Sequence, residues 1–419
     1  MTLRKLKVCL DARIPDGSAG GVQQFVMGLA SGLSRFTDGD EEYLFLSYPG
    51  DRAWLEPHLS GPCRPLDAAR PSESVSGPRR LLQAVLPRGA RRAIGSFVDG
   101  LRPIRVPASD GTVERSGAAV VHLTLQAGFT TSVPTIYQPF DLQHVHLPRF
   151  FSRYQRRWRA RTYPELARAA RSVVVMSSWI KDDVVRHLRV PAEKVRVISW
   201  APVTEEYAEP TPEDLERTRR RLLLPEAFAV FPAQTYPHKN HLGLIEAVEM
   251  ARRRGEAVEV VCPGQQNDFY PVIERRMKSR GARGVRFVGY VSPLEIRCLY
   301  RLARFLVFPT LFEGGGMPVF EAFAAGLPVA CSNVTCLPSQ AGDAALLFDP
   351  RDAGAMANAL IRLWRDAELR AELARRGSER VRRFSWDRTA RTYRALYREV
   401  AGAPLGSDDA ALLSSPPDT

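Results

Sequence analysis

The stretch from Pro309 to Gly326 reads P-T-L-F-E-G-G-G-M-P-V-F-E-A-F-A-A-G, and it decides the fold of the C-terminal half. The preceding residues 304–308 (R-F-L-V-F) are apolar, β-branched or aromatic, which is typical of a buried strand in a parallel sheet. Pro318 suits the first position of a helix and Gly326 the position just after its end, so a helix is expected over about 318–325. The stretch therefore predicts a strand, a glycine loop and a helix.

Three consecutive glycines, Gly314 to Gly316, stand between the strand and the helix. Glycine lets backbone N–H groups approach a ligand closely, and the positive end of a helix dipole favours a phosphate. Two carboxylates flank the loop, Glu313 just before it and Glu321 in the expected first turn, and carboxylates accept hydrogen bonds from sugar hydroxyls. The pattern favours a nucleotide-sugar pocket. The alternative is a plain strand, turn and helix in which Glu321 only complements the dipole.

The length and composition limit the classes of protein to which this chain can belong. A chain of 419 residues suits two α/β domains of roughly 200 residues each. It contains no apolar run of the roughly 18 residues that a transmembrane helix needs, and its start does not resemble a secretory signal peptide. The six cysteines form no C-x-x-C pair and no cluster with histidine. We therefore expect a cytoplasmic protein with reduced thiols and no bound metal.

The net charge of +13 comes mostly from arginine, and the arginines gather in the N-terminal half. Over residues 79–98 they alternate with apolar residues, as in a basic amphipathic helix at an anionic membrane surface. A solvated helix face in an arginine-rich protein remains the alternative. Because no helix-turn-helix, zinc-finger or RNP-type motif accompanies the charge, we do not expect a nucleic-acid partner.

Apolar runs alternate with amphipathic helices along the whole chain, which indicates doubly wound parallel sheets. Residues 201–224 are expected to link the two domains, residues 60–116 to form an insertion with one helix, and residues 403–419 to be disordered. Strands are expected near residues 6–10, 43–48, 118–123, 134–138, 172–176, 195–198, 227–232, 257–262, 285–288, 304–308, 328–331 and 345–348.

The order of several motifs resembles a known family. Glu313, seven intervening residues and Glu321 are similar to the Glu-x7-Glu signature of the large retaining glycosyltransferase family with the GT-B fold. Further resemblances cover nearly the whole chain, at P-H-K-N-H (237–241), F-V-G-Y-V-S (287–292), F-D-L-Q-H-V-H-L-P (140–148), G-D-A-A-L-L-F-D-P (342–350) and F-S-W (384–386). The variants at 237–241 and 313–318 are closest to the mannosyltransferase-like branch.

The resemblance implies two facing Rossmann-like domains with a cleft between them. The N-terminal acceptor domain would hold residues 1–200 and a helix that crosses back over 387–400, and the C-terminal donor domain would hold residues 201–386. An Asp38-Gly39-Asp40 sequence imitates the D-x-D metal motif of a different glycosyltransferase fold, and we interpret it as a decoy in an acidic turn.

The resemblance also assigns roles in the donor domain. Lys239 would neutralise charge on the leaving diphosphate, together with the backbone amides of Gly315, Gly316 and Met317 at the helix that Pro318 begins. Glu313 would hold sugar hydroxyls and Glu321 the ribose. His238 is a further donor contact, and backbone atoms of Tyr290 and Val291 would border the base. Many family members have an arginine six residues before the lysine, where this chain has Ala233.

In the N-terminal domain the resemblance implies donor contacts from Gly20 and Gly21, although turn-forming glycines are the alternative. The family usually has His-Asp after the strand that faces the cleft, but this chain reads Phe140-Asp141. Asp141 is retained as an acceptor or sugar contact, and His144 is a candidate substitute for the missing histidine. His146, which follows closely, is expected to be an ordinary surface or core histidine.

The sequence thus predicts a retaining, metal-independent glycosyltransferase that uses a nucleotide-sugar donor such as GDP-mannose or a UDP-sugar. Its acceptor could be a glycan, a lipid-linked sugar or a small molecule. A second hypothesis, motivated by Ala233 and Phe140, is a degenerate GT-B protein that binds a nucleotide sugar without turnover. A third is a basic peripheral protein that binds anionic lipid on the cytoplasmic membrane face through residues 79–98.

Overall fold

The computed structural model describes residues 5–15, 20–70, 104–203 and 209–415. The chain divides into two compact units. The N-terminal unit holds Met1–Val175, Lys181–Ile198 and Ala390–Ser415, and the C-terminal unit holds Met176–Ile180 and Ser199–Thr389. The predicted amphipathic helix over residues 79–98 lies outside the described residues.

The N-terminal unit is built on a seven-stranded sheet whose paired strands are all parallel, in the order β3-β2-β1-β4-β5-β6-β7. Buried Val, Leu and Phe side chains dominate these strands, as expected where both faces of a sheet are covered. The strands are β1 (Leu6–Asp11), β2 (Glu41–Ser47), β3 (Cys63–Asp67), β4 (Val120–Leu123), β5 (Thr135–Tyr137), β6 (Ser172–Val175) and β7 (Val195–Val197).

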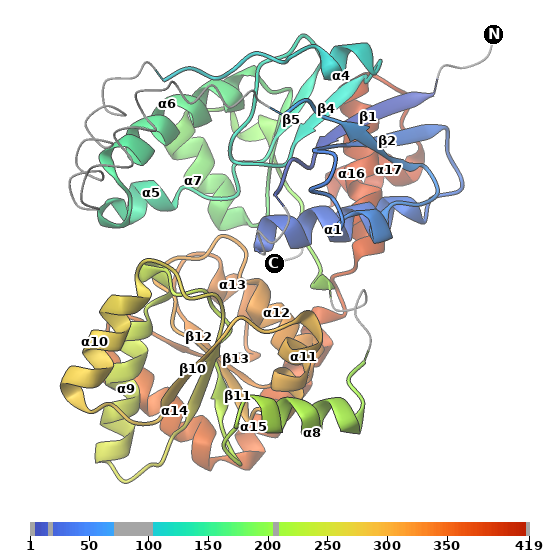
Figure 1. Cartoon of the computed structure of the whole chain (residues 1–419). Coiled ribbons are helices and arrows are strands. Elements are labelled where there is room, and N and C mark those ends of the chain that lie inside the picture. The colour runs from blue at the N-terminus through green and yellow to red at the C-terminus, as the bar shows by residue number, and fades with distance from the viewer. Residues whose placement is uncertain (1–4, 16–19, 71–103, 204–208, 416–419) are drawn as a thin grey trace. The chain divides into compact units, whose positions relative to one another are not determined.

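Helices connect these strands, and Figure 1 shows them around the sheet of this unit. The longer ones are α1 (Gly21–Ser34), α6 (Arg153–Ala169), α7 (Ser178–Leu188) and α16 (Trp386–Ala401). The short ones are α4 (Thr112–Arg115), α5 (Gln143–His146), α17 (Ser407–Ser414) and the 3-10 turns η1 (Glu56–His58), η2 (Pro148–Phe150) and η3 (Ala192–Lys194).

The C-terminal unit has a six-stranded parallel sheet in the order β10-β9-β8-β11-β12-β13. Its chain runs outward from β8 to β10 in one direction and then from β11 to β13 in the other. Right-handed crossovers therefore place the helices that connect β8 to β10 and the helices that connect β11 to β13 on opposite faces. The strands are β8 (Ala229–Val230), β9 (Val260–Pro263), β10 (Val285–Gly289), β11 (Phe305–Phe308), β12 (Val329–Ser332) and β13 (Ala345–Phe348).

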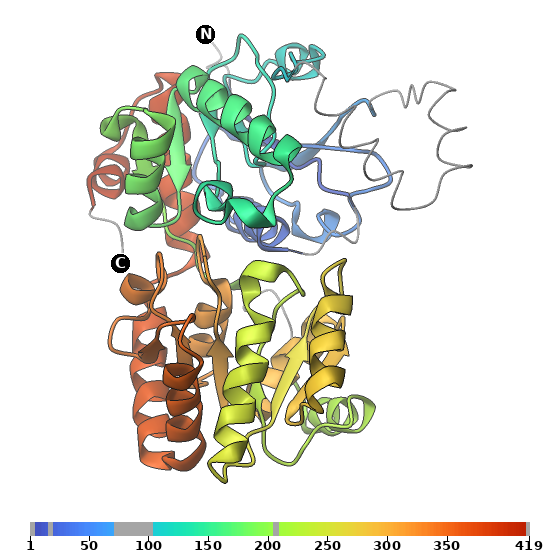
Figure 2. The ribbon, with the colours of Figure 1, turned by 90° about the vertical axis from the view of Figure 1, so that its left-hand side faces the viewer.

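The helices of this unit pack in layers over its sheet. Helix α9 packs on α14 and α10, and α12 packs on α15; Figures 1 and 2 both show α9 beside α10. The helices are α8 (Pro212–Arg221), α9 (His241–Arg253), α10 (Tyr270–Arg280), α11 (Pro293–Leu302), α12 (Met317–Ala324), α13 (Leu337–Ala341), α14 (Ala353–Arg365), α15 (Ala367–Val381) and the 3-10 turn η5 (Pro237–Lys239).

The last helices belong to the N-terminal unit from Ala390 onward. The hydroxyl of Tyr397 on α16 lies 2.9 Å from Nδ1 of buried His122, and the two rings are in contact. The expectation that residues 403–419 are disordered is wrong for 407–414, which form α17. Asp409 of α17 forms an ion pair of 2.7 Å with Arg398 of α16, and this pair fastens α17 to α16.

Four further predictions can be compared with the described residues. The predicted insertion over 60–116 contains β3, an edge strand that the sequence reading missed because its residues C-R-P-L-D lack an apolar run. Asp38 of the D-x-D imitation pairs with Arg394 at 2.7 Å, so this aspartate has a structural partner. All six cysteines are unpaired and buried. Among the described residues, the helices are too short or too polar to cross a membrane.

Candidate functional site

The candidate site forms at the point where the strand order of the C-terminal sheet reverses. β8 and β11 are paired neighbours, but the chain leaves β8 toward one edge of the sheet and β11 toward the other. In open parallel sheets, ligands bind beyond the carboxyl ends of the strands at such a switch point. The loop after β8 contains Lys239, and the loop after β11 contains Glu313 and the three glycines.

Lys239 and Glu313 meet as an ion pair. The Nζ atom of Lys239 lies 2.8 Å from Oε2 of Glu313, and the side chains are 17% and 16% exposed. The ammonium also sits 5.3 Å from the centre of the Phe308 ring, which adds a cation–π contact. Both charges are largely removed from water, so each depends on the other. The pair brings together Lys239, which the family resemblance assigns to the diphosphate, and Glu313, which it assigns to the sugar hydroxyls.

The two loops are also joined through their backbones. The carbonyl of His238 accepts a hydrogen bond of 2.7 Å from the N–H of Leu311 and lies 3.3 Å from the Thr310 hydroxyl. The His238 ring stacks on Tyr236 with centroids 5.8 Å apart. Burial, and then the charge of Lys239, hold the pKa of His238 well below its ordinary value. This histidine is therefore neutral near neutral pH and offers a hydrogen bond rather than a charge.

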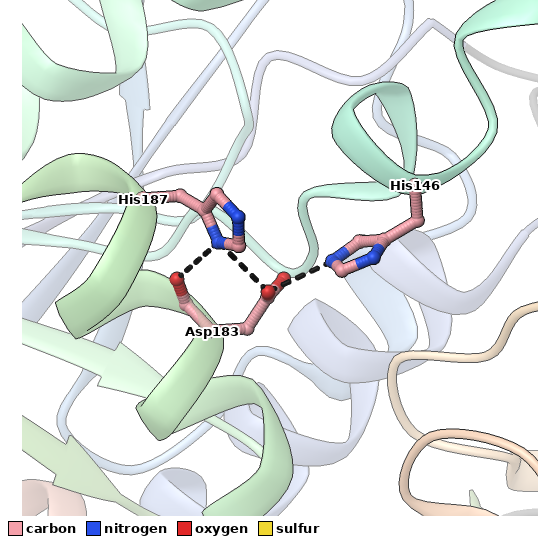
Figure 3. Close-up of side chains that lie close together, drawn as sticks. All are labelled: His146, Asp183 and His187. Atoms are coloured by element: carbon pink, nitrogen blue, oxygen red, sulfur yellow. Dashed lines mark hydrogen bonds and ion pairs between the residues drawn. The ribbon is translucent and has the colours of Figure 1, made fainter.

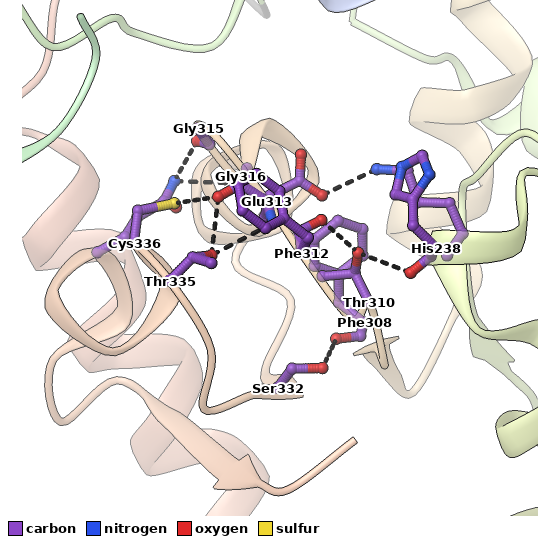
Figure 4. Close-up of polar contacts among 12 residues, drawn as sticks. His238, Phe308, Thr310, Phe312, Glu313, Gly315, Gly316, Ser332, Thr335 and Cys336 are labelled. Atoms are coloured by element: carbon purple, nitrogen blue, oxygen red, sulfur yellow. Dashed lines mark hydrogen bonds and ion pairs between the residues drawn. The ribbon is translucent and has the colours of Figure 1, made fainter. Parts of the chain in front are cut away.

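Residues that follow β12 hold the glycine loop from the other side (Figure 4). The Thr335 hydroxyl donates to the carbonyl of Glu313 at 2.7 Å, and the Cys336 thiol lies 3.4 Å from the same oxygen. The Gln340 amide donates to the carbonyls of Gly315 and Gly316 at 3.0 and 3.1 Å. With its carbonyls turned toward these donors, the loop is fixed in one conformation.

The helix after the loop begins one residue earlier than expected, because α12 spans Met317–Ala324. Gly316 caps it with a left-handed φ of 51°, a conformation that favours glycine, and Pro318 lies within its first two positions. Gly326 follows its end with φ 67°, as predicted. The expectation that Glu321 lies in the first turn is wrong, since the first turn of α12 contains no acidic residue. The free N–H groups at this end are therefore not offset by a carboxylate on the helix's own first turn.

Glu321 lies one turn further along, where it has a partner from another helix. Its Oε2 atom accepts a hydrogen bond of 2.6 Å from the hydroxyl of Tyr300 on α11. Tyr300 is only 4% exposed, and burial together with the Glu321 charge raises its pKa well above the ordinary value. Tyr300 therefore stays a hydrogen-bond donor at any physiological pH. It fixes one carboxylate oxygen of Glu321.

The loop after β10 contains Tyr290 and Val291. Tyr290 is 63% exposed, so its ring is available to a ligand. Ser292 and Glu295 form a capping box after it: Ser292 Oγ accepts from the N–H of Glu295 at 3.2 Å, and the Glu295 carboxylate accepts from the N–H of Ser292 at 2.8 Å. Asn240 stands at the N-cap of α9, but its side-chain amide donates to the carbonyl of Pro350 at 2.8 Å and makes no cap hydrogen bond.

The remaining predicted site residues belong to the N-terminal unit. Gly20 and Gly21 begin α1, and a Cβ atom at either position would meet nothing within 4 Å. The space around them is open, as both a ligand contact and a plain turn would allow. Asp141 accepts a hydrogen bond of 3.0 Å from the N–H of Gln143, which starts α5. That bond is local to the start of α5.

His144 is a poor substitute for the missing family histidine. It is 6% exposed, its ring packs edge-on against Tyr163 at 5.4 Å, and its Nδ1 atom has no partner among the described residues. Burial and nearby positive charge lower its pKa to about 4. Phe140, which stands in the family histidine's place, has a left-handed φ of 63° and packs against Phe25. A non-glycine residue in this conformation is strained and is often found at functional positions.

Sequence reasoning missed four residues that organise the candidate site. Thr335, Cys336 and Gln340 hold the glycine loop, and Tyr300 holds Glu321. Each follows or precedes the loop by many residues and has no motif of its own. Only the parallel pairing of β11 with β12 brings the first three near, and no one-dimensional pattern reports that pairing.

The chain resembles known proteins both in sequence and in fold. The family of glycosyl transferases group 1 matches residues 214–380, which contain Lys239, Glu313 and Glu321. This part of the chain is therefore similar to the group 1 glycosyl transferases. A relative in sequence is the O-antigen chain mannosyltransferase B of Escherichia coli, 27% identical over 252 residues, which cover 59% of this chain and 65% of that protein.

A second relative of this chain in sequence is a D-inositol 3-phosphate glycosyltransferase of Salinispora tropica, 34% identical over 195 residues, which cover 43% of this chain and 40% of that protein. The chain thus matches less than two thirds of the length of either relative. The structure of Anabaena HepE in complex with UDP and glucose covers 94% of this chain and 100% of its own, with a TM-score of 0.70 and 18% identity. The fold is GT-B, as predicted.

Proposed function

We propose that this protein is a glycosyltransferase that moves a hexose from a nucleotide diphosphate sugar to an acceptor hydroxyl, with retention at the anomeric carbon and with no metal ion in the transfer step. The observation that supports this best is the Lys239–Glu313 pair beside the glycine loop at the N-terminus of α12. It puts one cation and a row of backbone N–H groups beside a carboxylate. This is the combination that a sugar diphosphate requires.

The proposed roles follow from the chemistry of each group. Lys239 and the amides of Gly315, Gly316 and Met317 neutralise the charge that develops on the leaving diphosphate. When that phosphate approaches, Lys239 exchanges part of its contact with Glu313 for the new anion. Glu313 is then free to accept hydrogen bonds from hexose hydroxyls. Glu321, whose other oxygen is held by Tyr300, accepts from the ribose.

A retaining reaction by front-face attack needs no protein base in the place of the missing family histidine. In such a step the bond between the anomeric carbon and the leaving phosphate breaks while the acceptor oxygen attacks from the same face. The acceptor's proton passes to the leaving phosphate oxygen. Phe140 has no proton to exchange, and His144 is buried with a lowered pKa, so neither residue is suited to act as a base. The front-face reaction does not require one from them.

The relatives suggest the class of donor. A mannosyltransferase and an inositol phosphate glycosyltransferase are among the similar sequences, and HepE was solved with UDP and glucose. We propose GDP-mannose or a UDP-sugar as donor, and a glycan, a lipid-linked sugar or a small molecule as acceptor. Exposed Tyr290, with Val291, would border the base. An anionic membrane face remains a further proposed partner.

Nucleotide binding tests this proposal. Thermal-shift and calorimetric titrations with UDP, GDP, ADP and dTDP are expected to give one nucleotide that stabilises the protein. Glu321→Ala should weaken that binding, and Glu321→Gln, which still accepts from Tyr300, should weaken it less. Equal binding by the wild type and Glu321→Ala would remove the ribose role from Glu321. If no nucleotide binds, the donor site itself is refuted.

The alternative function is that of a protein that binds a nucleotide sugar without turnover. Ala233, in place of the family arginine, removes one cation, and its backbone lies close to Gly264, where a Cβ atom would clash with it. Slow hydrolysis or transfer of the bound donor by the purified protein would exclude this alternative. Tight nucleotide binding with no turnover would favour it.

A further inference from the structure

A second cluster of polar side chains lies in the N-terminal unit, outside the residues proposed for sugar transfer. It comprises His146 at the end of α5, and Asp183 and His187 on α7 (Figure 3). The Nε2 atom of His146 lies 2.8 Å from Oδ1 of Asp183, and Nδ1 of His187 lies 3.0 Å from the same oxygen. His146, expected to be an ordinary histidine, thus has a partner that lies 37 residues along the chain.

The arrangement of the three side chains follows from their positions. Asp183 and His187 are four residues apart on one helix, so they share a face of α7. The imidazole of His146 reaches that face from α5, and Figure 3 shows both rings turned toward the one carboxylate. The two rings are nearly perpendicular, with an interplanar angle of 76° and centroids 5.5 Å apart. Two nitrogens and a carboxylate therefore converge on one point.

The distances suit a small metal ion. One ligand atom from each residue can be chosen so that all three lie within 4.8 Å of one another. A tetrahedral ion with ligand bonds of about 2.0–2.1 Å needs ligand atoms about 3.3 Å apart. The observed contacts of 2.8 and 3.0 Å are shorter than this by only a few tenths of an ångström. Small side-chain rotations would make the space.

The carboxylate of Asp183 gives an independent reason to expect a cation. The side chain is 4% exposed, and its Oδ2 atom is buried without a hydrogen-bond partner among the described residues. A buried carboxylate oxygen with no donor costs free energy, and a metal ligand bond would remove that cost. The imidazoles are 32% and 30% exposed, so an ion could enter from solvent and keep a water molecule as its fourth ligand.

We propose that His146, Asp183 and His187 form a binding site for a divalent transition metal ion, of which Zn²⁺ suits the ligands best. Two imidazoles and one carboxylate are a ligand set that zinc takes with an open fourth position. Each imidazole binds through the nitrogen that now faces Asp183, and its proton moves to the other ring nitrogen. The ion joins α5 to α7 and takes no part in the proposed transfer step.

The test uses the full chain, without a polyhistidine tag and after removal of metal with a chelator. Titration with Co²⁺ is expected to give the intense visible absorption of a tetrahedral site, saturating at one equivalent. Zn²⁺ should displace the cobalt and raise the unfolding temperature, and the chelator should reverse both effects. No saturable binding at one equivalent would overturn the proposal.

Three variants distinguish metal binding at this site from nonspecific metal binding elsewhere on the protein. His187→Gln and His146→Gln change half-exposed residues and should weaken Zn²⁺ affinity more than about 100-fold, since even outer-shell partners account for 10–100-fold. Asp183→Asn should do the same, with its fold checked by circular dichroism. The matched control is His58→Gln, a histidine of the same unit that bonds to Ser31 at 2.9 Å and should bind as the wild type does. Unchanged affinity in both His187→Gln and His146→Gln would assign the metal to other residues.

Discussion

Lys239 is the residue on which the proposed transfer step depends most. Its ammonium is the one that contacts Glu313, and Ala233 stands where the family often has a second cation. Lys239→Ala should lower the turnover number by about 100-fold or more, the size of effect seen when one donor to a developing anion is removed. The measurement is the rate of transfer, or of donor hydrolysis, at saturating nucleotide sugar.

Lys278→Ala is the matched control for this prediction, because Lys278 also pairs with a glutamate, Glu274, at 3.1 Å but is 73% exposed. It should keep wild-type turnover. Since Lys239→Ala leaves Glu313 unpaired and largely buried, the double variant Lys239→Ala/Glu313→Gln shows how much of the loss comes from instability. Near-normal turnover in a folded Lys239→Ala protein would refute the role assigned to the lysine.

The sequence could identify Lys239, Glu313 and Glu321 because each stands in a short motif with a physical meaning. It could not show that the first two pair, nor that Tyr300 holds the third, because these contacts depend on which strands are neighbours. His146 illustrates the same limit. Its partner Asp183 lies on another helix, and no local pattern links the two. The roles carried over from the family remain predictions.

At the level of elements, the glycine loop is held by a steric fit as well as by hydrogen bonds. A Cβ atom at Gly316 would lie 2.2 Å from Oε1 of Gln340 and 2.6 Å from a methyl carbon of Leu337, and the residue has a left-handed φ of 51°. Gly316→Ala should therefore displace Gln340 from the loop carbonyls. We expect it to lower the free energy of unfolding by more than about 2 kcal/mol and to weaken nucleotide binding.

Gly281, at the end of α10, is a matched control because it has a similar φ of 57° but nothing within 4 Å of the added Cβ atom. Gly281→Ala should cost only the backbone strain, about 1 kcal/mol, and leave nucleotide affinity unchanged. Urea unfolding and calorimetry measure the two effects. Equal losses of stability in the two variants would mean that the contact with Gln340 is unimportant.

Elements were predictable from the sequence where a buried apolar run lies between turn residues. All six strands of the C-terminal sheet overlap the ranges expected for them. β8, β9, β11 and β12 are buried along their whole length, whereas β10 and β13 are mostly apolar but partly exposed. β3 was missed because it is an edge strand with Arg64 and Pro65 in its middle. Helix α17 was missed because its stability comes from a distant pair, Asp409 with Arg398, rather than from an amphipathic pattern.

At the scale of the whole molecule, the end of the chain completes the core of the N-terminal unit. Tyr397 of α16 is fully buried there, and its hydroxyl lies 2.9 Å from Nδ1 of His122 on β4. His122 is itself buried, and burial lowers its pKa to about 3, so it stays neutral and needs this partner. Tyr397→Ala would leave a large cavity and an unpaired ring nitrogen. We expect a loss of about 3–5 kcal/mol in the stability of this unit.

This loss should not reach the proposed donor site, because Lys239, Glu313 and Glu321 belong to the C-terminal unit. In conditions where Tyr397→Ala is still folded, its nucleotide affinity should equal that of the wild type, while its first unfolding transition moves to lower temperature. Leu405→Ala is the control: it changes a residue of the same terminal segment that is 41% exposed and should cost less than about 0.5 kcal/mol. A single transition that shifts as a whole, with weakened nucleotide binding, would show instead that the two units unfold together and that α16 couples them.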